Sequence, residues 1–363
     1  MGTVTVVREP SHTQLAVLAS TDVAAVRRVV AATASALCPD ADRHGRAELV
    51  ATELATNLLR HAEPGGWMLV RPLRPRSVEL IAVDRGPGIV DVPAAVEGRV
   101  PEPGGLGCGL AAVRRASARF DIWSRRGPSG PRSTGSRREA AMPGPGPGTV
   151  VLSVVDLDAE SRGSLRIAPP RQWAGVSVGI AEPCGDGWAV VEEDGVLSVA
   201  VVDGLGHGAK ASTAAEAALA QFAADPTDLD AFPRLANERM RETRGAAVTV
   251  CRLDQRVGEL RYVSIGNVNG RVVAPRETRG LVTYSGTLGL HLEPPRAKVA
   301  TAAWPAGASL VLWTDGLSTR VELTAGEPLL DRDPAVVAAV LHRDHARNRD
   351  DATVVVIHAG DRS

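Results

Sequence analysis

The stretch VLSVAVVDGLGHGAKAS, residues 196–212, decides how the C-terminal half of the chain is interpreted, because its apolar run stops abruptly at Asp203. Glycines follow at positions 204, 206 and 208. Two other apolar runs stop in the same way, VELIAVDRGPGI (78–89) at Asp84 and ASLVLWTDGLS (308–318) at Asp315. A carboxylate at the tip of a buried strand is costly to desolvate unless a partner satisfies it. These three aspartates are therefore the first candidates for a functional role.

The composition is that of an ordinary globular protein, and it argues against several classes of function. With 363 residues, 44% of them hydrophobic and 23% charged, the chain is long enough for two domains. Its formal net charge of −1 creates no overall field that would attract nucleic acid or an anionic membrane. No apolar run reaches the length of about 18 residues that predicts a membrane span, and the N-terminus lacks the basic-then-apolar order of a signal peptide.

The four cysteines, at positions 38, 108, 184 and 251, are scattered and form no CxxC pair. This distribution fits a reducing compartment and argues against a disulfide framework or a thiolate zinc site. We therefore expect a cytoplasmic protein with neither nucleic acid nor a membrane as its partner.

Hydrophobic periodicity predicts a mixed helix and strand domain over residues 1–157. A helix is expected at 22–37 with Ser20 or Thr21 as its cap, and another at 46–62. Strands are expected at about 67–72 and 78–84, and a third helix at about 108–118. The Gly-, Pro-, Ser- and Arg-rich segment at about 125–147 is expected to be a flexible insertion, and the polar stretch 158–170 a linker.

Residues 171–363 are richer in short strands and form the second expected domain. The runs AGVSVGIA, GWAVVEE and VLSVAVVD are separated by Gly and Asp turns, which indicates a meander. Helices are expected at about 209–223 and 229–241, and PAVVAAVLH (334–342) predicts a short helix before the last strand.

Glu53 and Asn57 lie four residues apart and share one face of the helix expected at 46–62. Their neighbours on that side are apolar, so both side chains need partners. An amide oxygen can ligate Mg²⁺ and a carboxylate can deprotonate an attacking hydroxyl, although a partly exposed helix face would also accommodate the pair.

The pair belongs to a longer ordered pattern. VDRGPGI places Asp84 at a strand end before two glycines, GGLGCGLAAVRR (104–115) opens a helix with further glycines, and GPGTVV places Thr149 before a strand. Glycines of this kind let backbone N–H groups approach phosphate at a helix N-terminus. One such motif is commonly just a turn, but the four in this order are far more specific.

This order resembles the GHKL superfamily of ATPases and kinases over about residues 20–157, and most closely the serine kinases that phosphorylate STAS-domain regulators in bacterial sigma-factor partner switching. The resemblance implies a two-layer α/β (Bergerat) fold that binds ATP and Mg²⁺. It assigns adenine recognition to Asp84, Mg²⁺ ligation to Asn57 and the role of general base to Glu53. It also places Gly86, Gly88, Gly105, Gly107, Gly109 and Thr149 around the nucleotide.

Two features set this half of the chain apart from other GHKL proteins. His12 and His44 lie in no long amphipathic helix, so the phospho-accepting histidine of a histidine kinase is not expected. The loop before Gly148 is much longer than the short turn of the small kinases. This loop could perturb the nucleotide lid, hold a partner or act only as a solvated tether.

Acidic residues mark the strand ends of the C-terminal half. Asp186 begins a strand, Asp203 and Asp315 end two others, and Asp350 and Asp351 precede the last. Asp-Gly pairs often only make turns. Gathered at one rim of a sheet, however, such carboxylates would repel each other and need cations, and oxygen ligands select hard ions such as Mg²⁺ or Mn²⁺. Two ions could activate a water for attack on phosphate.

The motifs CGDGWAV, VVDGLGHG, LWTDGL and DDATVVV resemble, in order, those of the SpoIIE branch of the PP2C-like protein phosphatases over residues 172–360. The resemblance implies a β-sandwich flanked by helices, so that the whole chain is α+β. It also implies two Mn²⁺ or Mg²⁺ ions. The implied ligands are Asp186, Asp203, the Gly204 carbonyl, Asp315 and Asp350, with Asp350 preferred to Asp351. His207 is a phosphate contact or a turn residue, and the role of Asn267 in SIGNVNG is open.

Together the halves resemble two enzymes of opposite chemistry. We expect a protein serine/threonine kinase half and a metal-dependent phosphatase half that both act on STAS-domain regulators of a sigma factor. An alternative is an anti-sigma module that binds a sigma factor or an anti-anti-sigma protein in an ATP-dependent way and is fused to an active phosphatase. A third is a phosphatase with an ATP-sensing domain, which Glu53 argues against because a sensor needs no base.

Overall fold

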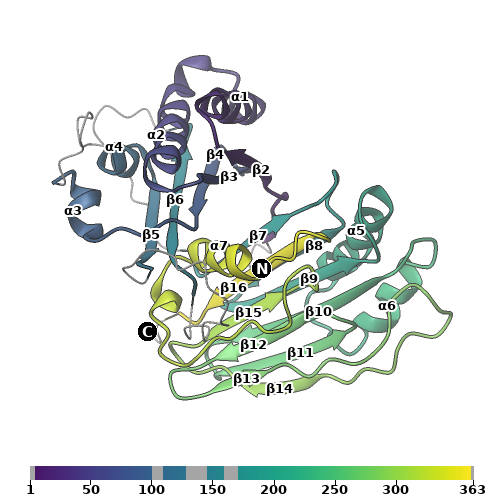
Figure 1. Ribbon diagram of the computed structural model, residues 1–363. Helices are drawn as coiled ribbons and strands as arrows, with labels where there is room; N and C mark the ends of the chain where they lie inside the picture. Colours follow the sequence, from purple (N-terminus) through teal and green to yellow (C-terminus); the bar gives the residue numbers. More distant parts are fainter. Residues whose placement is uncertain (1–4, 100–108, 128–144, 159–170, 361–363) are drawn as a thin grey trace, which may run out of the picture. The chain divides into compact units, whose positions relative to one another are not determined.

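The computed structural model describes residues 5–99, 109–127, 145–158 and 171–360 (Figure 1). The chain forms two compact units that interleave along the sequence. The α/β unit comprises His12–Pro170 and Asp331–Asp344, and the sandwich unit comprises Met1–Ser11, Arg171–Leu330 and His345–Ser363. The expected insertion at 125–147 and linker at 158–170 lie almost entirely outside the described residues.

The α/β unit is one antiparallel sheet with helices packed against it. The sheet has the order β2-β3-β4-β6-β5, and all of its neighbouring strands are antiparallel. Its elements are β2 (Thr13–Val17), α1 (Ser20–Leu37), η1 (Ala41–Arg43), α2 (Gly45–His61), β3 (Gly66–Leu73), β4 (Ser77–Asp84), α3 (Val92–Glu97), α4 (Gly109–Ala116), β5 (Arg119–Arg125), β6 (Gly148–Asp156) and α7 (Pro334–His345).

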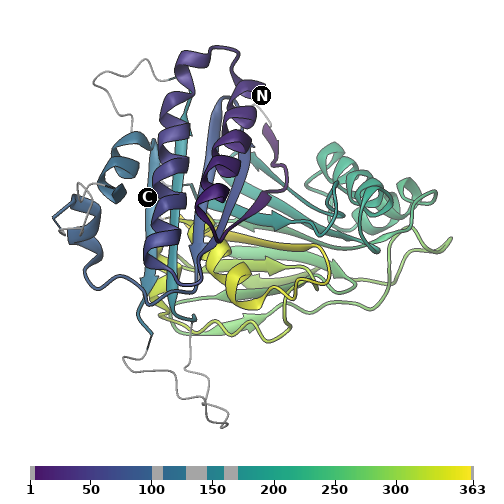
Figure 2. The ribbon, with the colours of Figure 1, turned by 45° about the horizontal axis from the view of Figure 1, so that its top comes forward.

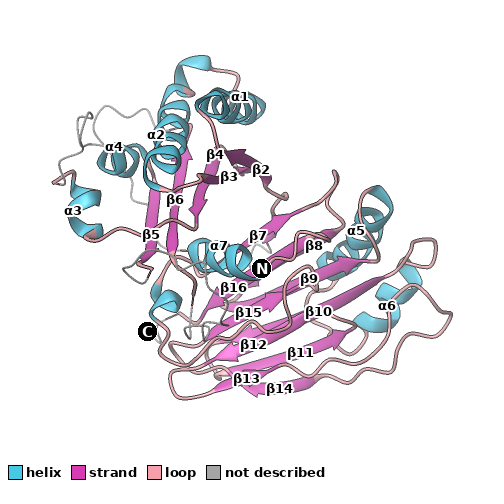
Figure 3. Ribbon diagram, viewed as in Figure 1, coloured by secondary structure: helices cyan, strands magenta, loops and turns pink. Residues whose placement is uncertain are grey.

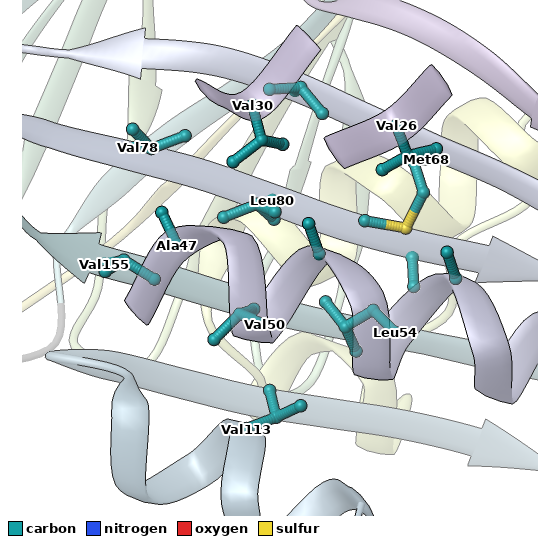
Figure 4. Close-up of a cluster of buried hydrophobic side chains, with 14 of the residues drawn as sticks. Val26, Val30, Ala47, Val50, Leu54, Met68, Val78, Leu80, Val113 and Val155 are labelled. Carbon is teal, nitrogen blue, oxygen red and sulfur yellow. The ribbon is translucent and has the colours of Figure 1, made fainter. Parts of the chain in front are cut away.

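Helices α1 and α2 lie side by side across one face of this sheet (Figure 2). Their apolar stripes meet alternate residues of the strands, as the period of two along a strand requires. Figure 4 shows the resulting core, in which Val26, Val50 and Leu54 of the helices point toward Met68 and Leu80 of the sheet. This face holds α2, and therefore Glu53 and Asn57, in place.

The cap expected for α1 was wrong. The N-cap is Ala19, and Ser20 and Thr21 lie in the first turn. The carboxylate of Asp22 instead accepts the N–H groups of Leu18 and Ala19, both at 2.9 Å. An acidic side chain in the first turn thus satisfies the backbone where no hydroxyl does.

The opposite face of the sheet carries a buried charge cluster. Glu79 on β4 accepts hydrogen bonds from Arg71 at 2.7 Å and from Arg119 at 3.2 Å, and its carboxylate lies 3.1 Å from the His12 ring. Burial alone would raise the pKa of Glu79, but these neighbours lower it well below its usual value. We call these four residues the Glu79 cluster.

The sandwich unit consists of two packed sheets, drawn in magenta in Figure 3. One sheet has the order β1-β8-β9-β10-β11-β14 and the other β13-β12-β15-β16-β7. Its elements are β1 (Thr5–Arg8), β7 (Trp173–Val178), β8 (Asp186–Glu193), β9 (Val196–Gly204), α5 (Ala209–Ala224), α6 (Phe232–Arg239), β10 (Ala246–Asp254), β11 (Glu259–Ile265), β12 (Asn269–Val273), β13 (Thr278–Gly280), β14 (Ala300–Ala303), β15 (Ser309–Trp313), η2 (Pro328–Asp331) and β16 (Ala352–His358).

Alternation along the strands separates two cores. Trp188, Val199 and Leu310 belong to the core between the sheets, whereas Ala189, Val202 and the apolar side of α5 form a second core on the outer face of the six-stranded sheet. Strands β9 and β15, which lead to Asp203 and Asp315, are thus fixed by apolar packing along their length.

The α+β class and the two expected folds are confirmed, with one correction to strand order. The meander expected for the first three strands was wrong, because β7 pairs with β16 in the second sheet and only β8 and β9 form a hairpin. The cause is long-range pairing that local turn signals do not encode.

The two units also exchange short segments relative to the expected boundaries at 157 and 171. Strand β1 pairs with β8 of the sandwich unit, and residues 331–344, which include most of α7, belong to the α/β unit.

Among the described residues, no helix has both the length and the apolar character that a membrane span requires.

Candidate active sites

In the α/β unit, α2 and α4 bring the expected base and magnesium ligand together. Glu53 and Asn57 lie one turn apart on α2, and both are half-buried. Gly109, the first residue of α4, lies directly against them. A Cβ built there would be 3.2 Å from Glu53 Oε2 and 3.3 Å from Asn57 Oδ1. A glycine at this position leaves room beside both oxygens, so the arrangement fits a metal–nucleotide complex.

Asp84 lies at the end of β4, as expected, and one of its oxygens is held by the backbone. Oδ1 accepts the N–H of Gly86 at 2.8 Å and the N–H of Thr149 at 3.0 Å. Burial raises the pKa of this carboxyl, and the two N–H donors oppose that rise. The carboxylate is therefore fixed in direction, which is what recognition of a base requires.

The loops around Asp84 are packed too tightly for side chains. Gly88 and Gly148 both have positive φ, and a Cβ at either would collide with backbone, at Gly88 with the carbonyl of Arg125 and at Gly148 with the carbonyl of Asp84. Thr149 is buried and its hydroxyl is 3.0 Å from the Ser124 hydroxyl. Gly105 and Gly107 lie outside the described residues, so their expected contact with phosphate is not described.

In the sandwich unit, strand pairing brings the first two acidic residues together. Asp186 and Asp203 are direct partners across the β8–β9 hairpin. Asp186 is buried, and its Oδ2 accepts the hydroxyl of Thr314 at 2.7 Å. Antiparallel partners on one face lie close enough for like charges to repel. The register itself thus creates a pair of acids at the sheet edge.

Asp315 and Asp350 extend this pair into a larger acidic group. Asp315 lies two residues beyond the end of β15, its backbone N–H donates to the carboxylate of Asp203, and its own carboxylate accepts a hydrogen bond from the amide of Asn267. Asp350 lies just before β16 and is half-buried, and it is close enough to Asp315 to raise the pKa of that residue. Residues distant in sequence therefore converge at one site.

Asp351 is engaged differently from Asp350. It is buried, and its two oxygens accept the N–H groups of Ile180 at 2.7 Å and Gly185 at 2.6 Å. Within the described part of the chain, the Asp350 carboxylate accepts the N–H of Asp351 at 2.9 Å through one oxygen, Oδ1. Asp351 thus fixes two loops, and Asp350 is the acid with coordination capacity to spare.

The electrostatics of this acidic site favour the binding of a cation. Burial, followed by the Asp315 charge, raises the pKa of Asp203 to about 7. Burial and then Asp203 raise the pKa of Asp186 well above its usual value, and burial and then Asp350 raise that of Asp315. Carboxylates with raised pKa values crowded together are stabilised by a metal ion that neutralises them.

The donor set fits a hard divalent cation. The buried Oδ2 of Asp203 has no hydrogen-bond partner in the described part of the chain. The expected ligands are carboxylate and carbonyl oxygens, which suit Mg²⁺ or Mn²⁺. Within the same described ranges, no three His, Cys, Asp or Glu side chains form a ready-made metal cage. The fit to a cation therefore rests on the donor chemistry of these carboxylates and on the unsatisfied oxygen of Asp203.

Gly204 is required by packing, because a Cβ there would collide with the carbonyl of Ala211 in α5. Its own N–H donates to the carbonyl of Gly185 at 3.2 Å. His207 is exposed in the loop between β9 and α5, and its role as a phosphate contact stays a prediction.

Two polar residues of this site were not assigned from the sequence. Thr314 is fully buried and links Asp186 to β16 by accepting the N–H of Thr353 at 3.0 Å. Asn267, whose role was open, donates to Asp315. The signal for Thr314 was a hydroxyl at the end of an otherwise apolar strand, beside an acid.

Family models match both halves of the chain. Residues 193–360 match the model described as stage II sporulation protein E (SpoIIE), and residues 17–131 match the histidine kinase-like ATPase domain. The chain is 30% identical over 139 residues to the phosphoserine phosphatase RsbX of Bacillus subtilis, an alignment that covers 37% of this chain and 68% of RsbX. It is 36% identical over 73 residues to the serine/threonine-protein kinase RsbT of the same organism, covering 20% of this chain and 55% of RsbT.

Two solved structures each resemble about half of this chain. A chain from work on the bacterial stressosome is 26% identical, with a TM-score of 0.45, and the match covers 51% of this chain and 97% of that one. The structure of RsbX in complex with magnesium is 24% identical, with a TM-score of 0.44, and the match covers 51% and 92%.

Proposed function

The chain belongs to the SpoIIE family of PP2C-like phosphatases and also carries a histidine kinase-like ATPase domain, and from this we propose that it is a bifunctional regulator of bacterial partner switching. In this proposal the α/β unit phosphorylates a serine or threonine of a STAS-domain protein, and the sandwich unit hydrolyses such phosphoesters. The observation that carries the hydrolytic half is the group of neighbouring buried and half-buried carboxylates around the unsatisfied oxygen of Asp203.

For the kinase half, three residues have distinct tasks. The free side of the Asp84 carboxylate would accept the adenine amino group while its other oxygen stays on the backbone. Asn57 would hold Mg²⁺, and Glu53, beside it on α2, would take the proton from the attacking hydroxyl. Positioning and charge neutralisation are the main requirements of phosphoryl transfer, and this arrangement is suited to both.

For the phosphatase half, Asp186, Asp203, Asp315, Asp350 and the Gly204 carbonyl would hold two Mn²⁺ or Mg²⁺ ions. When bound, such ions neutralise the phosphate and lower the pKa of a bound water. Thr314 and Asn267 would keep two of the carboxylates oriented. Asp350 is the preferred ligand over Asp351, because each oxygen of Asp351 already accepts a backbone N–H.

The class of substrate is inferred from the relatives. RsbX is named a phosphoserine phosphatase and RsbT a serine/threonine kinase, and one chain resembles both over separate halves. The resemblance of the kinase half to kinases of STAS-domain regulators supports STAS-domain proteins as the shared partner. Joining the two activities in one chain raises the effective concentration of each at that partner.

The test uses the full chain with ATP, Mg²⁺ and Mn²⁺ against a panel of STAS-domain proteins, followed by intact mass. We expect one or more of them to gain about 80 Da of phosphate and to lose it when ATP is removed. Glu53→Gln should abolish the gain and keep ATP binding, whereas Asp203→Asn should abolish the loss. Hydrolysis that survives Asp203→Asn would refute the metal assignment. ATP-dependent capture of a partner without any phosphorylation would favour the anti-sigma binding module instead.

A further inference from the structure

Helix α7 comes from the C-terminal part of the sequence, yet its residues up to Asp344 belong to the α/β unit. The sequence PAVVAAVLH is apolar around the whole helix circumference, which is typical of a helix that is buried on more than one side. Each end of this helix is attached to the α/β unit through charged side chains. The end that carries Arg343 lies at Asp84.

Arg343 is buried and bonds to the backbone on both sides of the proposed adenine site. Its guanidinium donates to the carbonyl of Asp84 at 3.3 Å and to the carbonyl of Gly146 at 2.8 Å. The first carbonyl belongs to the last residue of β4, and the second lies two residues before Gly148, where β6 begins. The side chain of Arg343 thus links the end of β4 to the start of β6. These are the same two segments that the hydrogen bond from the Thr149 N–H to Asp84 Oδ1 joins.

Asp344 completes this contact and orients the arginine. Its carboxylate accepts two hydrogen bonds from Arg343, at 2.8 and 3.0 Å, and the N–H of Gly146 at 2.9 Å. The side chain of Arg85 in turn donates to the carbonyl of Arg343 near the end of the helix. A two-point ion pair of this kind fixes geometry as well as energy. We call Arg343 and Asp344 with their two backbone partners the α7 clamp.

The other end of the helix is anchored on β5. Asp333 accepts the N–H of Ala335 at the start of α7, its own N–H donates to Asp121 at 2.7 Å, and its carboxylate lies 3.2 Å from Arg119. The helix is therefore held at both ends by the sheet of the α/β unit. A shift of β4 relative to β5 would therefore displace one end of α7 relative to the other.

The chain runs from this clamp straight into the acidic site of the sandwich unit. Only five residues separate Asp344 from Asp350. Within the sandwich unit, the N–H of Ser318 donates to the carbonyl of His345 at 2.9 Å, and the N–H of Arg347 donates to the carbonyl of Gly316 at 2.9 Å. The residues after α7 are thus bonded to the loop that carries Asp315.

We propose that Arg343 is a positioning residue for the adenine-binding carboxylate and that α7 couples nucleotide binding to the metal site of the phosphatase. This inference rests on the proposed function, because it takes Asp84 as the base-recognising residue. A bound adenine adds a contact to the second oxygen of Asp84 and, through the α7 clamp, further restrains the end of α7. The residues that follow then hold Asp315 and Asp350 in the geometry that binds metal. Nucleotide binding should therefore raise the metal affinity of the phosphatase.

The first measurement is nucleotide affinity in the full chain. Arg343→Met removes the guanidinium and keeps much of the side-chain length. ATP binding should weaken by about tenfold or more, and the preference for ATP over GTP should narrow, because a hydrogen bond to a charged group that orients Asp84 is lost. Arg343→Lys should restore part of the affinity. Arg332→Met, which removes an exposed cation before the same helix, is the matched control and should change neither quantity.

The second measurement is the Mn²⁺ dependence of p-nitrophenyl phosphate hydrolysis, with and without a saturating non-hydrolysable ATP analogue in excess Mg²⁺. The half-saturating Mn²⁺ concentration should fall about fivefold with the analogue in the natural chain and in Arg332→Met, and should not change in Arg343→Met. If Arg343→Met does not fold, Asp344→Asn tests the same clamp by releasing both the arginine and Gly146.

Three outcomes separate the possible failures. A natural chain that binds no ATP would refute the proposed function itself. If Arg343→Met binds ATP as tightly as the natural chain does, the positioning role of Arg343 is overturned and the proposed function still stands. An Mn²⁺ dependence that the analogue leaves unchanged in the natural chain would overturn the coupling.

Discussion

Two groups of buried carboxylates, one in each unit, are compensated in opposite ways. In the α/β unit, Glu79 is surrounded by Arg71, Arg119 and His12, and its pKa is lowered despite complete burial. In the sandwich unit, Asp186 and Asp203 face each other, and the described donors around this acidic group are hydroxyl, amide and backbone groups, with Arg347 lowering the pKa of Asp315. The pKa values of Asp186 and Asp203 are raised. Burial is common to both groups, so the difference lies in whether the protein supplies the counter-charge.

This difference separates a structural cluster from a functional one. A buried acid that the fold neutralises serves stability, and its removal leaves uncompensated cations. A buried acidic group without cations of its own destabilises the metal-free fold and is retained for what it can bind. Asp333 beside Arg119 is intermediate, because burial still raises its pKa against the arginine. The comparison therefore predicts opposite stability effects for neutralising a single acid in each group.

The largest expected effect is on the stability of the metal-free chain. Glu79→Gln should destabilise the α/β unit by about 3–5 kcal/mol, because Arg71 and Arg119 lose their buried partner. Asp203→Asn should stabilise the sandwich unit in EDTA, because it removes a repelled, desolvated charge. Hydrogen exchange on peptides from β3–β4 and from β8–β9 measures the two units separately.

Glu48→Gln is the control for this pair of variants. Glu48 lies in the same unit as Glu79 but bonds to Arg27 at the surface, where ion pairs contribute about 0–1 kcal/mol. A destabilisation by Asp203→Asn as large as that by Glu79→Gln would contradict the distinction between the two groups.

The second effect is the response to divalent metal. Mn²⁺ at a hundredfold excess over its dissociation constant should stabilise the sandwich unit by about 2.7 kcal/mol and leave β3–β4 exchange unchanged. Asp203→Asn should abolish this gain. The same exchange experiment with and without Mn²⁺ measures it, and equal stabilisation of both units would show that the ion does not select the acidic site.

Much of this comparison was visible in the sequence. Asp84, Asp186, Asp203 and Asp315 were recognisable because each interrupts or borders an apolar run at its end. Glu79 in VELIAVD is equally visible as an acid inside an apolar strand. What the letters did not show is which cations reach it, since Arg119 approaches from 40 positions away. Whether a buried acid has a cation beside it therefore depends on which strands pair, and the sequence alone does not show this pairing.

The exchange of segments between the units was not predictable for a related reason. The helix at 334–342 was expected from its apolar run, but its attachment depends on hydrogen bonds that join Arg343 to Asp84 across 259 positions. Similarly, β7 pairs with β16 because of sheet topology, which local turns do not specify. The local sequence pattern predicted the helices and strands, whereas contacts between distant residues determined which elements pack together.

A third prediction concerns the donors that hold the acidic group in place of cations. Thr314→Val removes the hydroxyl that Asp186 accepts at 2.7 Å and keeps the shape of the side chain. Metal affinity should fall about 10- to 100-fold, as for other residues that orient a ligand. Mn²⁺ titration of hydrolysis measures the change. Thr249→Val, which removes a buried hydroxyl bonded to Ser264 in the same unit, is the control and should leave Mn²⁺ affinity unchanged.

The smallest and most specific effect is how each stability difference varies with pH in EDTA. The folded-state pKa of Glu79 lies below its unfolded value, so its contribution is present at neutral pH and is lost only as the pH falls below about 4.5. The folded-state pKa of Asp203 is raised to about 7, so ionisation of Asp203 costs the fold nothing below the unfolded pKa of 3.8. The cost grows as the pH rises from 3.8 and reaches its full size above pH 7. Between pH 8 and 5, Glu79→Gln should therefore remain less stable than the natural chain by an unchanged amount. Over the same interval the stability advantage of Asp203→Asn should shrink steadily, and it should disappear only below the unfolded pKa of 3.8. Parallel curves for the two variants over this interval would mean that the two groups of acids are compensated alike.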